Sequence, residues 1–71
     1  ARLDLAADRR SRALQVHAAH AEPGVDVEAT AAALAVELAT LAGWLGLETI
    51  AVGAGGDLAP ALRAAVGRAR D

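Results

Sequence analysis

Two short runs of alternating apolar and polar side chains, separated by a charged turn, constrain the fold of this chain more than any other feature. Residues 2–5 read Arg-Leu-Asp-Leu, the period-two pattern of a half-buried strand. A second run over residues 13–21 follows a five-residue turn and ends at Glu-Pro-Gly, residues 22–24. The pattern predicts an antiparallel hairpin that stops at the proline.

Alternation in the second run also predicts which side chains share a face of the strand. Leu14, Val16 and Ala18 are expected to lie on one face. The opposite face is then expected to carry Gln15, His17 and Ala19. His17 and His20 are three residues apart, which on a strand places them on opposite faces. A metal shared by the two histidines is therefore not expected, and we favour structural roles for both.

A long helix is predicted after the hairpin. Asp26 is suited to the N-cap, and leucines recur at spacings of four, three and four residues, which indicates one buried stripe. The leucines of this stripe are Leu34, Leu38, Leu41 and Leu45. Gly46 is expected to end the helix in a left-handed conformation, and Leu47 to pack back on the last turn.

A third strand and a second helix complete the predicted fold. Residues 48–52 read as a short strand, and residues 53–56 form a glycine-rich turn. Asp57 is expected to cap the last helix, with Pro60 in its first turn. The expected buried stripe of this helix is Leu58, Leu62, Ala65, Val66 and Ala69. The chain is thus predicted to be a small α+β subdomain with the element order β-β-α-β-α.

The composition indicates a small core. The 71 residues include no cysteine, Trp44 is the only aromatic residue, and alanine dominates, so disulfides are excluded and little area is buried per residue. The first strand pattern also begins at the first residues of the sequence. We therefore expect residues 1–71 to be a single subdomain cut from a larger protein, with its hairpin in a larger sheet or barrel completed by the parent chain.

Charge and hydropathy limit the classes of function. A net charge of −2 is not typical of an autonomous nucleic-acid binder. No apolar run was expected to be long enough for a membrane span, and Asp4 and Asp8 interrupt any signal-peptide pattern. We expect a cytoplasmic location and no membrane partner.

The sequence offers little catalytic or cofactor chemistry. Gly53 and Gly55 stand between a strand and a helix, where a phosphate loop would lie, but Leu58 replaces the third glycine and Asp57 would repel a phosphate. We favour a plain turn and expect neither a nucleotide cofactor nor a metal. Ser11 lies far in sequence from either histidine, so no catalytic residue is assigned and enzymatic activity stays uncertain.

The turn between the first two strands is the best candidate for a contact. Arg9, Arg10 and Arg12 could hold a phosphate backbone at the hairpin tip. The alternative is a solvated turn with ion pairs to Asp4 and Asp8. Trp44 likewise allows base stacking, although packing in the core or in an interface is favoured by its leucine neighbours.

Several segments resemble the C-terminal region of one protein family. These segments begin with Arg-Leu-Asp-Leu-Ala-Ala-Asp-Arg (residues 2–9), Ala-Leu-Gln-Val-His (13–17) and Ala-Glu-Pro-Gly (21–24). They continue with Leu-Ala-Gly-Trp-Leu-Gly-Leu (41–47) and Gly-Asp-Leu-Ala-Pro-Ala-Leu-Arg (56–63). In this order the chain resembles the bacterial winged-helix crosslink-repair DNA glycosylases of the AlkZ/YcaQ type.

The resemblance implies a function for the parent protein and none for this segment alone. Such glycosylases excise N7-alkylated purines and unhook interstrand crosslinks, and they stack winged-helix domains before a small β-rich domain. Their catalytic glutamine motif lies earlier in the chain, and Gln15 does not match it because Val16 and His17 follow it. Arg9 matches the family's turn, whereas Ala6 stands where a lysine is common. The implied partners are double-stranded DNA and the rest of the parent chain; the alternative is a non-catalytic α/β interaction or oligomerisation module.

Overall fold

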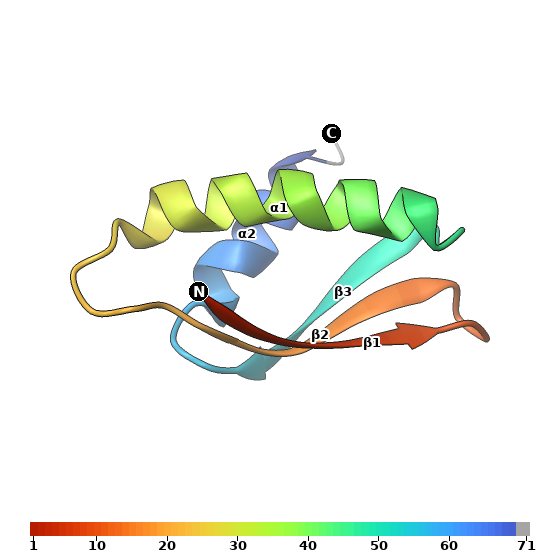
Figure 1. Cartoon of the computed structure of the whole chain (residues 1–71), viewed down its shortest axis with the longest axis horizontal. Helices are drawn as coiled ribbons and strands as arrows, with labels where there is room; N and C mark the ends of the chain where they lie inside the picture. The colour runs from red at the N-terminus through yellow and green to blue at the C-terminus, as the bar shows by residue number, and fades with distance from the viewer. Residues whose placement is uncertain (70–71) are drawn as a thin grey trace.

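Three strands and two helices form a two-layer α+β fold in the computed structural model, which describes residues 1–69 (Figure 1). The elements are β1 (Arg2–Asp8), β2 (Ala13–His20), α1 (Val27–Trp44), β3 (Thr49–Gly55) and α2 (Ala59–Ala69). The sheet order is β1-β2-β3, with β1 antiparallel and β3 parallel to β2. Both helices lie on one face of the sheet (Figure 1). The predicted fold class and element order are confirmed.

The ends of α1 are built as the sequence predicts. The Asp26 carboxylate accepts a hydrogen bond from the Ala29 backbone N–H at 3.1 Å, which satisfies one free donor of the first turn. At the other end Gly46 has a φ of +72°, and the Leu47 N–H donates to the Ala42 carbonyl at 2.8 Å. Leu47 is buried on the last turn, as expected for this left-handed helix end.

A β-bulge at His17 reverses the expected face of the residues after it. Val16 pairs with Leu5 and Ala18 pairs with Asp4, so His17 is the extra residue of β2. The alternation shifts by one position, and Ala19 becomes fully buried while Ala18 is only half-buried. The prediction that Ala18 shares a face with Leu14 and Val16, and Ala19 with Gln15 and His17, was wrong, because a bulge interrupts the period of two.

The stripe of α1 that faces the core differs from the predicted leucine stripe. Its buried residues are Ala31, Ala35, Leu38 and Ala42. Of the four leucines only Leu38 is buried, while Leu34 and Leu45 are half-buried and Leu41 is 38% exposed. The spacing is still four, three and four, but the helix is rotated so that small alanines meet the sheet and α2. Close packing of alanines against these surfaces decides the rotation.

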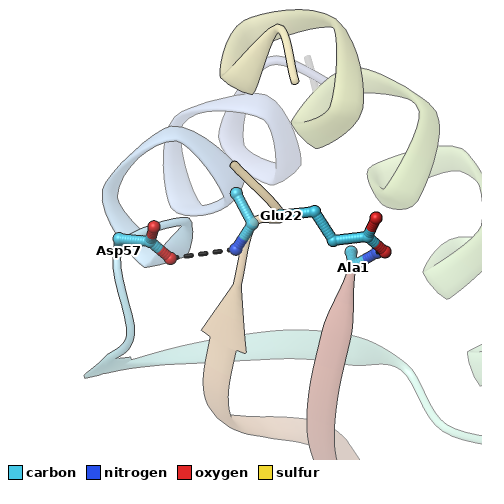
Figure 2. A network of polar contacts seen from close by, with 4 residues as sticks. Ala1, Glu22 and Asp57 are labelled. Carbon is cyan, nitrogen blue, oxygen red and sulfur yellow. Dashed lines mark hydrogen bonds and ion pairs between the residues drawn. The ribbon is translucent and has the colours of Figure 1, made fainter. Parts of the chain in front are cut away.

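The connection from β3 to α2 is held against the end of β2. Leu58 N–H donates to the Ala19 carbonyl at 3.0 Å, and the Asp57 carboxylate accepts from the Ala21 N–H at 2.9 Å (Figure 2). Figure 2 also shows Glu22 beside Ala1, whose amino group lies 3.2 Å from the Glu22 carboxylate. Asp57 was expected to cap the last helix, but α2 begins at Ala59 and the hydrogen bond of Asp57 joins two loops instead.

Most of the predicted buried stripe of α2 is confirmed. Leu58 and Leu62 are fully buried, and Ala65 and Val66 are buried beside them. Ala69 is exposed, contrary to the expectation, because it lies in the last described turn of the helix. On the outer side of α2, Arg63 donates to the carbonyls of Val52 and Gly53 at 3.0 Å each, and so occupies two backbone acceptors of β3.

Within residues 1–69, one helix meets the length and composition expected of a membrane span. This helix is α1, with 18 residues and a mean hydropathy of 1.3. The expectation that no run is long and apolar enough was therefore wrong, because alanines raise the hydropathy of α1 despite Glu28 and Glu37. A helix of a soluble core meets the same criterion, so the finding is weak evidence for a span.

Candidate nucleic-acid interface

The hairpin tip between β1 and β2 is organised by Asp8. One carboxylate oxygen accepts from the backbone N–H groups of Arg10, at 3.0 Å, and Ser11, at 3.4 Å. The other oxygen accepts from the Gln15 side chain at 3.2 Å. An aspartate that satisfies turn donors in this way fixes the backbone locally. The Asp8 carboxylate therefore fixes the turn by hydrogen bonds to backbone N–H groups of the turn, and not by ion pairs with the arginine side chains.

Arg12 joins the hairpin to the loop that follows α1. It adopts a φ of +56°, and its carbonyl accepts from the N–H groups of Glu48, at 2.7 Å, and Thr49, at 3.2 Å. Its guanidinium lies 2.9 Å from the Glu48 carboxylate, with 68% and 60% of the two side chains exposed. An exposed pair of this kind contributes less than about 1 kcal/mol. The backbone bonds are the stronger attachment.

Arg9 lies against the end of α1. Its Nη1 donates to the carbonyl of Leu45 at 3.0 Å. A cation at this position donates to an otherwise unpaired carbonyl and interacts favourably with the negative, C-terminal end of the helix dipole. The alternative reading of the turn expected ion pairs to Asp4 and Asp8, and this part was wrong. Glu48 and a helix carbonyl are the partners that the fold brings within reach.

Arg10 differs from the other two arginines. Its backbone N–H is held by Asp8, but its exposed guanidinium makes no hydrogen bond or ion pair within residues 1–69. The structure brings all three arginines to one tip and engages two of them with the protein. Of the three arginines, Arg10 is therefore the one whose guanidinium is free to bind an external anion. The sequence alone does not distinguish it from Arg9 and Arg12.

Trp44 lies outside the core of the described residues. Its side chain is 87% exposed at the end of α1, directly before the Leu45 carbonyl that Arg9 contacts. The prediction of core packing was wrong, because the rotation of α1 turns Ala42 inward instead. Packing in an interface stays a prediction. A shallow hollow on this side of α1 is lined by Val36, Glu37, Thr40, Leu41 and Trp44.

The other sequence candidates have structural explanations. A side-chain carbon at Gly55 or Gly56 would meet backbone oxygens of β2 at 2.7 Å or 2.0 Å, so these glycines allow a close approach of two chain segments. Within residues 1–69 no group of three or more His, Cys, Asp or Glu residues could hold a metal ion. A pocket of about 200 Å³ between α1, β3 and α2 is lined mainly by apolar residues, with Glu48 and Thr49 as its polar residues.

Comparisons with known proteins found no relative of this chain. The chain matches no protein-family model, no curated protein and no solved structure. The resemblance to the crosslink-repair glycosylases therefore rests on the sequence motifs described above, and the hairpin tip with its three arginines is the candidate interface that the fold supports best.

Proposed function

We propose that this chain is a non-catalytic subdomain beside the DNA-binding cleft of a crosslink-repair DNA glycosylase. The observation that carries the proposal is the hairpin tip, where three exposed arginines are gathered on a backbone fixed by Asp8 and Arg12. Guanidinium groups on a preformed turn suit contacts with successive phosphates. The motif order over nearly the whole chain supplies the link to the glycosylases.

The proposed roles of the three arginines differ. Arg10 contacts a phosphate with its unengaged guanidinium, while Arg9 and Arg12 orient the tip through Leu45 and Glu48 and add positive charge nearby. Base excision itself is assigned to the earlier domains of the parent, where the resemblance places the catalytic glutamine motif.

Salt-dependent DNA binding by the full-length parent tests the contact. Replacing Arg9, Arg10 and Arg12 together by alanine is expected to lower the affinity for duplex DNA and to flatten the salt dependence by about 0.9 per lost phosphate contact. Arg68→Ala, in the last turn of α2, is the control for loss of one positive charge and is compared with Arg10→Ala alone. Unchanged binding of the triple variant at low salt would remove the hairpin tip from the DNA interface.

Base release tests the assignment of the parent. A duplex carrying an N7-alkylguanine crosslink is incubated with the full-length parent, with and without residues 1–71. Release by the intact parent supports the glycosylase assignment, and truncation then measures how far this subdomain contributes. Absence of release by the intact parent would contradict the assignment and favour the second candidate.

The second candidate is a non-catalytic interaction or oligomerisation module. The exposed apolar side chains of α1 favour it, because Trp44 is 87% and Val36 is 65% exposed on the same helix. A contiguous patch of large exposed apolar side chains is typical of a protein interface, whereas single exposed apolar side chains are normal on any protein surface. In this case Trp44→Ala abolishes partner binding while the triple arginine variant leaves it unchanged.

A further inference from the structure

The outer edge of β1 is free within residues 1–69. The strand has β2 on one side only, and it contains neither proline nor glycine over its seven residues. The bulge lies in β2 at His17, so the backbone of β1 itself stays regular. An edge strand of this length presents a row of unpaired N–H and C=O groups that can receive another strand.

The opposite edge of the sheet differs. Arg63 of α2 donates to the carbonyls of Val52 and Gly53, so two acceptors of β3 are already occupied. Leu5, in contrast, pairs with the buried Val16 and so faces the core side, yet it is 37% exposed. Only β1 combines free backbone groups with an incompletely covered leucine.

The sequence of β1 is complementary to itself when it is read in the antiparallel direction. With a two-fold axis at Leu5, Arg2 of each copy lies opposite Asp8 of the other. Leu5 then lies opposite Leu5, while Leu3 lies opposite Ala7. Side chains directly opposite in an antiparallel pair are about 4.5–5.5 Å apart at Cβ, close enough for the ion pairs and the leucine contact to form.

The two registers nearest to this one are disfavoured by charge. In an antiparallel pair, side chains directly opposite each other lie on the same face of the sheet. The helices of both copies therefore lie on one side of the joined sheet only when the two-fold axis passes through a residue of β1, and not when it passes between two residues. An axis at Asp4 would place two Asp4 side chains opposite each other, and an axis at Ala6 would place Asp4 opposite Asp8. Like charges in direct opposition are destabilising. The axis at Leu5 avoids both.

We propose that two copies of this chain pair antiparallel through β1 about a two-fold axis at Leu5 and form a continuous six-stranded sheet. The exposed guanidinium of Arg2 has no hydrogen bond or ion pair within residues 1–69, and Asp8 of the second copy supplies one. Three donors already bind the Asp8 carboxylate, which offers about four acceptor sites, so one further donor fits. This inference is independent of the proposed function.

Single cysteines test the register directly, because the chain has none of its own. In the proposed dimer a cysteine at residue 5 faces its counterpart across the axis, within reach of a disulfide. A cysteine at residue 7 is separated from its counterpart by four strand positions, about 13 Å. Leu5→Cys is therefore expected to form a disulfide-linked dimer under mild oxidation, while Ala7→Cys is expected to form no disulfide-linked dimer at the same concentration. Equal behaviour of the two variants would overturn the proposal.

Sedimentation equilibrium of the unmodified chain and of two charge variants provides the second test. Arg2→Glu replaces two attractive pairs per dimer by two like-charge pairs and is expected to weaken dimerisation at least about tenfold. Ala51→Glu places a glutamate on β3, away from the axis, and is expected to leave the dissociation constant within about twofold. A chain that stays monomeric throughout, as when a strand of a longer parent fills this edge, would contradict the proposal.

Discussion

Gly56 lies so close to Ala19 that a Cβ atom at residue 56 would stand 2.0 Å from the Ala19 carbonyl oxygen. The next residues of the loop bind the same region, since Leu58 N–H donates to that carbonyl and Asp57 accepts from the Ala21 N–H. The approach of the β3–α2 loop to β2 therefore depends on a residue without a side chain.

Gly56→Ala is expected to destabilise the fold by more than about 2 kcal/mol, because it adds a clash with rigid backbone to the strain of a φ of +90°. Gly24→Ala is the control: residue 24 has a φ of +82° but nothing within 4 Å of the added atom. Its cost is expected to be about 1 kcal/mol. Urea unfolding measures both, and equal losses would rule out the close approach.

Leu38 and Leu41 test the rotation of α1. Leu38 is 2% exposed and Leu41 is 38% exposed, although the leucine spacing alone places both on the buried stripe. Leu38→Ala is expected to cost about 2–4 kcal/mol of unfolding free energy, whereas Leu41→Ala is expected to cost less than about 1 kcal/mol. Similar losses from the two substitutions would show that the predicted leucine stripe, and not the alanine stripe, meets the core.

Asp26 tests the start of the same helix. Asp26→Ala removes the acceptor for the Ala29 N–H and is expected to lower the free energy of unfolding by about 1 kcal/mol. Asp26→Asn keeps a side-chain oxygen at the cap and is expected to be nearly neutral. Thermal unfolding followed by circular dichroism at 222 nm distinguishes them. Equal destabilisation by both variants would assign the effect to charge and not to the capping bond.

Alanine substitutions of Arg10 and Arg9 distinguish an effect on DNA affinity from an effect on the stability of the hairpin tip. Arg10→Ala is expected to change the unfolding free energy by less than about 0.5 kcal/mol, since its guanidinium has no partner within residues 1–69. Arg9→Ala is expected to cost about 1 kcal/mol through loss of the bond to the Leu45 carbonyl. A loss of DNA affinity in the stable Arg10 variant would therefore report a contact directly.

Trp44 gives a spectroscopic test of its exposure. It is the only aromatic residue, so the tryptophan fluorescence of the chain comes from one site. With 87% of its side chain exposed, its emission maximum and acrylamide quenching in the folded chain are expected to lie close to those of the urea-unfolded chain. A strongly blue-shifted emission that is independent of protein concentration would place Trp44 within the fold instead.

The features that the sequence predicts well are local ones. Asp26 and Gly46 bound the long helix as expected, because capping depends on residues within a few positions of the helix end. The order of strands and helices follows from the two hydrophobic periods in the same way. The candidate arginines also lie at the hairpin tip, since a turn between two strands is itself a local feature.

The features that it misses depend on contacts distant in sequence. The bulge at His17 leaves no mark in the period of two, so the burial of Ala19 was not predictable from alternation. The rotation of α1, which leaves Trp44 exposed, is set by how closely alanines approach the sheet and α2. Likewise Arg9 finds its partner 36 residues away, at a helix end that only the folded chain brings close.

The contact between Arg63 and β3 limits how far this sheet can grow. A domain with two open edges can add copies at both, which produces a linear polymer. Here the Arg63 guanidinium of α2 already holds the carbonyls of Val52 and Gly53, two of the acceptors that an added strand would use at β3. Strand addition at β3 would have to displace this side chain, which favours a finite dimer through β1 over a linear polymer.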